Sequence, residues 1–162
     1  MRLTKQTNFA VLALIYCAIA DPALSRVGDI AACFRISEPF LFKILSPLIE
    51  VGLLESVRGR RGGVRLGRPA DAISLDTVLR LTEDNLVLFE EIAPSGDLTR
   101  AATGGYAAAL DQALSAFLAA LGGHTIAGLA NDPGLRSLYG LDRAGQPRSL
   151  LSLQRRKKHA YR

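Results

Sequence analysis

The stretch from Asp29 to Leu66 constrains the fold more than any other part of the chain, because it fits a helix, a tight turn, a second helix and a β-hairpin in that order. Residues 27–34 form a short amphipathic segment, and Ser37 then offers a hydroxyl that caps a helix start. Pro39 falls in the first turn, where its missing N–H costs little. Apolar residues then recur at helical spacing, at Phe40, Leu41, Ile44, Leu45 and Leu48. The pattern predicts a helix-turn-helix.

A hairpin with a basic tip follows the second helix. Residues 53–58 and 64–66 are strand candidates on either side of a glycine- and arginine-rich turn. The stretch 56–68 holds no acid and five arginines, which are Arg58, Arg60, Arg61, Arg65 and Arg68. Arginine pairs well with phosphate, and glycine permits close backbone approach. We therefore predict a mainly α fold with a small β wing, in which a winged helix-turn-helix domain binds DNA. A solvated basic hairpin without a ligand is the alternative.

The second helix is expected to enter the major groove. Glu38 would accept from a cytosine amino group, Phe40 would touch a thymine methyl, and Lys43 would reach guanine or phosphate. Ordinary core packing is the alternative for Phe40 and Phe42, one of which we expect in the core. Pro47 should bend the helix near Ser46. The predicted DNA-binding residues of the helix and wing are Ser37, Glu38, Phe40, Lys43, Arg58, Gly59, Arg60, Arg61, Gly62 and Gly63.

The charge is distributed unevenly along the chain. Residues 1–68 carry ten Lys and Arg against five Asp and Glu, residues 69–147 carry four against ten, and residues 148–162 carry six and no acid. One end is thus suited to a polyanion, and the basic end of the chain is either a solvated tail or a source of non-specific DNA affinity. No catalytic constellation, signal peptide or bilayer-spanning run is recognised, so we expect a cytoplasmic protein that is not an enzyme.

A second helical stretch, residues 98–130, is rich in alanine and carries one apolar stripe, made of Leu110, Leu114, Phe117, Leu118 and Leu121. A single long helix has too little core of its own, so we expect it to pair with its copy in a homodimer. Folding back on its own domain is the alternative. The predicted organisation is a winged domain over 1–80, a linker over 81–97, this dimerisation helix over 98–130, and an irregular basic tail over 131–162.

Residues 1–10, 37–45, 57–66 and 81–84 resemble the IscR/NsrR/RirA family of bacterial winged-helix transcriptional regulators, and most of all its iron-responsive RirA members. The resemblance covers residues 1 to 130. It implies a sequence-specific regulator, which we expect to be a repressor, bound as a homodimer to a double-stranded DNA operator. It also implies that Arg2, Thr4 and Lys5 contact the DNA backbone, for which a frayed polar N-terminus is the alternative, and that the helix over 98–130 forms the dimer.

The family's iron–sulfur ligands are absent. Relatives carry three cysteines that hold a cluster, and these positions align with Glu91, Leu98 and Gly104, while Asn8 stands where some relatives supply a further ligand. We therefore expect no cofactor. The signal is open between a redox role of Cys17, a small ligand between the winged domain and the long helix, and no sensing. A winged-helix protein-interaction adaptor is the alternative function.

Overall fold

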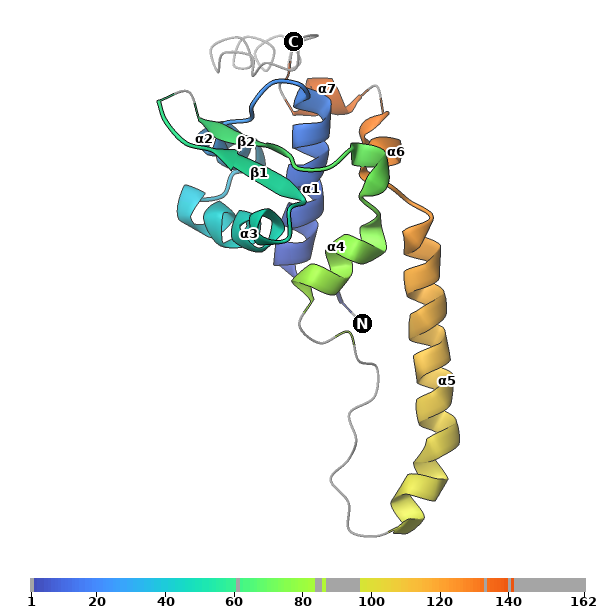
Figure 1. The fold of residues 1–162 in the computed structure, drawn as a ribbon. Helices are drawn as coiled ribbons and strands as arrows, with labels where there is room; N and C mark the ends of the chain where they lie inside the picture. The colour runs from blue at the N-terminus through green and yellow to red at the C-terminus, as the bar shows by residue number, and fades with distance from the viewer. Residues whose placement is uncertain are drawn as a thin grey trace, which may run out of the picture.

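The computed structural model describes residues 2–60, 62–83, 86, 97–132, 134–139 and 141. It is mainly helical with one two-stranded sheet, which confirms the predicted fold class. α1 stands in the middle, with the hairpin and two helices on one side and the long α5 on the other (Figure 1). In chain order the elements are α1 (Lys5–Ala20), α2 (Val27–Phe34), α3 (Glu38–Glu50), β1 (Leu54–Val57), β2 (Gly63–Leu66), η1 (Ala70–Ala72), α4 (Leu75–Thr82), α5 (Asp97–Gly122), α6 (Ile126–Ala130) and α7 (Leu135–Leu138).

α1 forms the centre of the core because it is apolar nearly all round. It contacts α3, α4, α6 and β2, and its inner residues Ala10, Ala13 and Leu14 are fully buried. The helix begins at Lys5, because the Thr4 hydroxyl accepts the backbone N–H of Thr7 at 3.2 Å.

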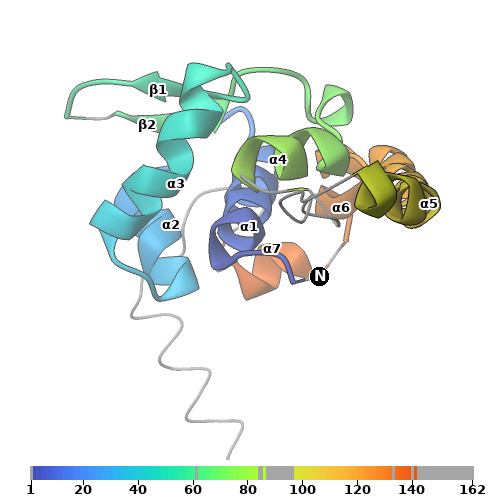
Figure 2. The same ribbon diagram turned by 90° about the horizontal axis from the view of Figure 1, so that it is seen from below.

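The helix-turn-helix forms as predicted. Arg35 adopts a left-handed conformation, with φ of 56°, between α2 and α3. The Ser37 hydroxyl then accepts the backbone N–H of Phe40 at 3.3 Å and caps α3. Pro47 lies inside α3, which continues to Glu50, so the proline does not end the helix. Figure 2 shows α2 and α3 together on the side of α1 that also carries the hairpin.

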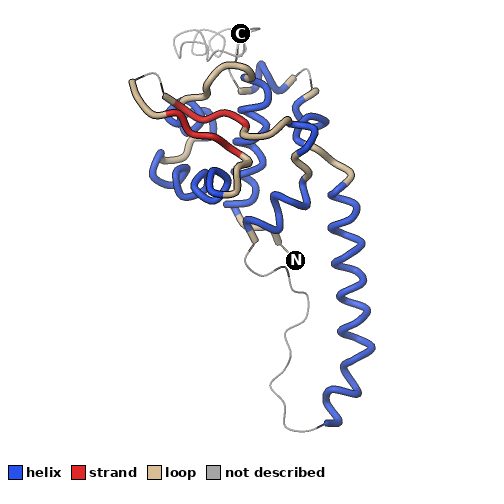
Figure 3. Tube along the Cα trace, viewed as in Figure 1, coloured by secondary structure: helices blue, strands red, loops and turns tan. Residues whose placement is uncertain are grey.

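The wing is an antiparallel hairpin in which Leu54 pairs with Leu66 and Val57 pairs with Gly63 (Figure 3). Ser25 extends it by one residue of a third strand. Its N–H donates to the carbonyl of Val64 at 2.9 Å, and the N–H of Val64 donates back at 2.8 Å. These two hydrogen bonds fix the wing to the connection between α1 and α2.

The end of α4 is tied to the start of α1. The carboxylate of Glu83 accepts the backbone N–H of Thr4 at 2.7 Å and the hydroxyl of Thr7 at 2.5 Å, and the Thr7 and Thr82 hydroxyl oxygens lie 2.8 Å apart. Burial alone would raise the pKa of Glu83, but the hydrogen bonds from Thr7 and Thr4 together hold this pKa below its usual value. The charged carboxylate therefore joins two helices distant in sequence.

Ser74 occupies the N-cap position of α4 without making a side-chain capping hydrogen bond. Its hydroxyl accepts no backbone N–H of the helix and donates instead to the carboxylate of Asp76 at 2.5 Å. Asp76 lies in the first helical turn, where the helix dipole favours a negative charge.

The chain after α5 returns to the core, which corrects the predicted boundaries. α5 ends at Gly122, Thr125 caps α6 by accepting the N–H of Gly128 at 3.2 Å, and α6 packs on α1. Ile126 and Leu141 are almost fully buried, and the ring of Tyr139 stacks on Tyr16 at a centroid distance of 5.8 Å. The described residues 131–132, 134–139 and 141 therefore do not form an irregular tail. With α1–α4, the hairpin and α6–α7, they form what is here called the winged domain.

α5 extends beyond this domain (Figure 1). A backbone bridge between Ser74 and Thr125 joins the chain entering α4 to the chain leaving α5. Among the described residues, no helix combines the length and the apolar character needed to cross a bilayer.

Candidate nucleic-acid interface

α3 has one inward and one outward face. Leu41, Ile44, Leu45 and Leu48 are buried in the core, while Pro39, Phe42, Lys43 and Ser46 are exposed at the spacing of one helical stripe. The Ser46 hydroxyl donates to the carbonyl of Phe42 at 2.8 Å, so its proton is used within the helix. Lys43 belongs to neither of the two ion pairs formed by the described residues. Phe42 and Lys43 therefore dominate the outward face.

The two phenylalanines of α3 differ in burial, as expected for a pair of which one packs on the core. Phe40 is half-buried, and its ring meets Phe9 edge-on at a centroid distance of 6.0 Å. The packing on Phe9 makes Phe40 the phenylalanine of the pair that contacts the core, and its expected contact with a thymine methyl stays a prediction. Phe42 is 51% exposed. Helical periodicity does not reveal this, because the two residues are equally apolar and adjacent to the same core stripe.

Glu38 lies at the edge of the outward face nearest α2. A Cβ atom placed on Gly28 would come within 3.1 Å of its Oε1 atom, so the carboxylate rests over the first turn of α2. A helix start attracts negative charge, which accounts for this position. The contact of Glu38 with cytosine stays a prediction, and so does a base or phosphate contact of Ser37, whose hydroxyl caps α3.

The wing arginines are of two kinds: some are held by bonds within the chain, and others are exposed and in no ion pair of the described residues. Arg65 bonds Glu55 through two nitrogens, each 2.9 Å from the same carboxylate oxygen. Arg68 donates to the carbonyl of Val51 at 2.8 Å and so closes the end of α3. Arg58 and Arg60 are exposed and are in neither ion pair of the described residues. Arg61 lies outside the described residues.

The wing glycines are needed to shape the tip. Gly59 has φ of 113°, a conformation that side chains disfavour. A Cβ on Gly62 would overlap the carbonyl oxygen of Val57, and one on Gly63 would lie 2.5 Å from the carbonyl oxygen of Ser25. The glycines thus present the neighbouring arginines, and their own contact with DNA stays a prediction.

The predicted N-terminal contacts lie at the start of α1. Arg2, Thr4 and Lys5 are exposed. The Thr4 hydroxyl already caps α1, which leaves the two basic side chains as the stronger candidates for phosphate. Phe9, one turn further on, contacts Phe34 and Phe40, so this end of α1 adjoins the helix-turn-helix.

The two thiols of the chain lie within the winged domain. Cys17 is 1% exposed, and burial raises its pKa to about 12 against a smaller opposite effect of the Ser25 hydroxyl. Burial also raises the pKa of Cys33, whose sulfur lies 3.7 Å from the carbonyl oxygen of Tyr139. Thiolates are the ligands of iron–sulfur clusters and the reactive form of cysteine in redox chemistry. The raised pKa values of Cys17 and Cys33 disfavour the thiolate form of both. The described residues also hold no cluster of three metal-ligating side chains.

The apolar stripe of α5 has mixed surroundings. Leu118 is 4% exposed within the single chain, where α5 packs on α4, so its expected place in a dimer contact is wrong. Leu110, Leu114, Phe117 and Leu121 are only partly covered. The last two border an apolar groove of about 460 Å³ between α1, α4 and α5, whose lining is completed by Leu3, Thr7, Asn8, Val11, Leu12, Leu75 and Leu79.

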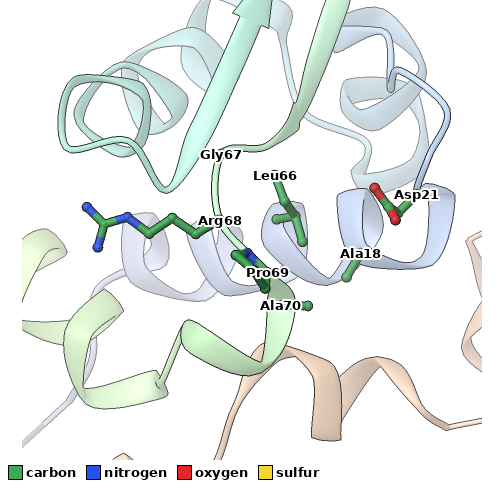
Figure 4. A pocket seen from close by; sticks show the side chains of 7 residues that line it. All are labelled: Ala18, Asp21, Leu66, Gly67, Arg68, Pro69 and Ala70. Carbon is green, nitrogen blue, oxygen red and sulfur yellow. The ribbon is translucent and has the colours of Figure 1, made fainter.

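A second hollow, of about 300 Å³, lies where the chain leaves the wing and passes the end of α1 (Figure 4). Asp21 and Arg68 stand at opposite ends of its lining, and Arg68 points away toward α3. Its polar groups do not converge on a common point, as those of a ligand site do.

The chain matches the Rrf2 family, described as an iron-dependent transcriptional regulator, over residues 3–132. The chain belongs to the Rrf2 family. This Rrf2 protein is 40% identical over 143 residues to the HTH-type transcriptional regulator NsrR of Geobacillus kaustophilus, which covers 85% of this chain and 96% of that protein. It is 47% identical over 151 residues to the protein aau3 of Rhizobium meliloti, and this match covers 92% of this chain and 98% of that protein.

Among solved structures, this Rrf2 protein shares the fold of CymR, the global cysteine regulator of B. subtilis, with a TM-score of 0.65 and 24% identity over 80% of this chain and 96% of that one. The predicted family and the predicted DNA-binding transcriptional regulator are thereby confirmed. Membership points to a non-enzyme. The particular resemblance to RirA stays a prediction.

Proposed function

We propose that this Rrf2 protein is a homodimeric repressor that binds a two-fold DNA operator without an iron–sulfur cluster. The observation that carries the proposal is the exposed stripe of α3 beside a glycine-shaped tip, on which Arg58 and Arg60 form no ion pair with any other described residue. The helix has the dimensions of a major-groove reader, and the arginines suit the flanking phosphates. A protein seated over a promoter in this way excludes other proteins from it.

The apolar groove supports the homodimer. A groove lined almost wholly by leucine, valine and phenylalanine, on a chain that acts in water, favours an apolar partner. α5 borders this groove and extends beyond the winged domain, where its half-covered leucines need a cover of their own. A second copy of α5 meets both requirements at once, since each copy offers a stripe and a groove.

The donor set supports operation without a cluster. The family description names iron, yet the two thiols of this chain are on separate helices, and Cys17 is enclosed by the core. A cluster takes four strong ligands, mostly thiolates. Two cysteines, one of them inaccessible without opening α1, do not fit that requirement.

One set of measurements tests these points. Genomic fragments selected by the purified protein should share a palindrome whose half-sites are separated by whole turns of about 10 base pairs. Light scattering should give the mass of a dimer at micromolar concentration, and a monomer that still binds DNA would refute the homodimer. Protein purified without oxygen should hold no stoichiometric iron and sulfide, and finding both would refute the cluster-free proposal. Failure to enrich any sequence would refute sequence-specific binding.

A further inference from the structure

The outward face of α3 carries an apolar ring where a polar residue would be expected. Phe42 is 51% exposed, and its neighbours on this face are Pro39, Lys43 and Ser46. The core is complete without it, because Leu41, Ile44, Leu45 and Leu48 fill the inner face of the helix. A single exposed phenylalanine is common, but this one lies in the second turn of the helix that faces DNA.

We infer that Phe42 is a sequence-reading residue that packs against the 5-methyl group of thymine in the major groove. The inference rests on the proposed function in that it requires an operator. In B-DNA the thymine methyl is the apolar group that base pairs display in the major groove. The polar groups that distinguish the base pairs there are hydrogen-bond donors or acceptors, with which a phenyl ring gains little.

The neighbours of Phe42 make this contact selective. Lys43 brings a cation to the same groove wall and suits guanine or phosphate. Ser46 gives its proton to the backbone of α3, so it does not compete for the same base. Phe40 is turned into the core against Phe9. The ring of Phe42 is therefore the largest apolar group on this face, beside the smaller Pro39, and it should favour thymine over cytosine, which lacks the methyl.

The wing supports the approach of the ring to the groove floor. Arg58 and Arg60 lie at the tip of the neighbouring hairpin and supply positive charge that can bind the phosphates of the DNA backbone. The hairpin is fixed by the Ser25–Val64 hydrogen bonds, so the distance between tip and helix is set by the fold. Phosphate contacts then position the protein while Phe42 reads a base, a division common in protein–DNA complexes.

The test is a double-mutant cycle between the ring and the methyl group. After selection of a tightly bound duplex, each thymine is replaced in turn by deoxyuridine, which lacks the methyl. At one position in each half-site, the affinity of the wild-type protein should fall about four-fold for each methyl removed. This factor corresponds to the free energy gained by burying one methyl-sized group. Phe42→Ala should bind the parent duplex more weakly and should show no further loss with deoxyuridine at that position.

Two control variants separate reading from general binding. Lys43→Ala should weaken binding but keep its sensitivity to the methyl, and Phe42→Leu should retain part of it. Because Phe42 is exposed, Phe42→Ala should unfold at the wild-type temperature. The inference is overturned if deoxyuridine costs wild type and Phe42→Ala the same factor at every position. It is also overturned if Phe42→Ala changes the oligomeric state, since the ring would then contact protein. If no duplex is enriched, the proposed function fails along with it.

Discussion

The difference between Arg60 and Arg65 gives the sharpest prediction about DNA binding. Both are wing arginines, and Arg60→Ala and Arg65→Ala change the net charge equally. Arg60 is exposed and outside the ion pairs of the described residues, whereas Arg65 is held by Glu55 at 2.9 Å. To reach a phosphate, Arg65 would have to leave that carboxylate. We therefore expect Arg60→Ala to lose phosphate contacts and Arg65→Ala to lose few.

The size of the effect follows from counterion release. A dimer has two wings, so Arg60→Ala removes two phosphate contacts and should flatten the log–log salt dependence of affinity by about 1.8. When the salt concentration is raised from about 50 to about 200 mM, the ratio of wild-type affinity to variant affinity should then fall about twelve-fold. Fluorescence anisotropy of a labelled duplex, titrated at five salt concentrations, measures this slope.

Arg65→Ala serves as the matched control, because its slope should stay close to that of the wild type. Equal flattening by both variants would show that total charge, and not the free guanidinium of Arg60, determines the salt dependence. The division of the wing arginines argued from the Glu55 ion pair would then be refuted.

Three further predictions concern stability and reactivity. Gly63→Ala should destabilise the fold by about 2–3 kcal/mol in urea unfolding, since its Cβ would lie 2.5 Å from the Ser25 carbonyl, whereas Gly104→Ala, in open space on α5, should be neutral or stabilise by up to about 1 kcal/mol. Because the pKa of Glu83 is lowered in the folded state, its carboxylate stabilises the fold above the unfolded-state pKa, and this stabilisation is lost as the pH falls through the folded-state pKa. Glu83→Gln should therefore make the free energy of unfolding fall less steeply with decreasing pH in the acid range. Cys17, with its pKa raised to about 12, should resist iodoacetamide at pH 8 until urea is added, as mass spectrometry would report.

Local chemistry made much of the fold predictable. Ser37 and Pro39 mark the start of α3, and the structure has both in those roles. The glycines of the wing predict a turn, and steric contacts at Gly62 and Gly63 explain them. Such features depend on neighbours within a few residues, which is the range over which a sequence can be interpreted directly.

Features that depend on distant partners were not predictable in this way. The orientation of Phe40 is decided by Phe9, which lies on another helix. Arg65 has its charge neutralised because the hairpin register places Glu55 opposite it. The burial of Leu141 requires the chain to return to the core after α5, which depends on contacts with residues far away in the sequence.

The backbone bridge between Ser74 and Thr125 affects how well the protein tolerates insertions and deletions between these two residues. The N–H of Leu75 donates to the carbonyl of His124 at 2.9 Å, and the N–H of Ile126 donates to that of Ile73 at 2.8 Å, so the chain that leaves α5 is fastened to the chain that enters α4. Lengthening or shortening the chain between Ser74 and Thr125 should cost the domain little, because closure entropy changes slowly with loop length. During synthesis, by contrast, the core stays incomplete until Leu141 has left the ribosome, since α1 lacks its cover until α6 arrives.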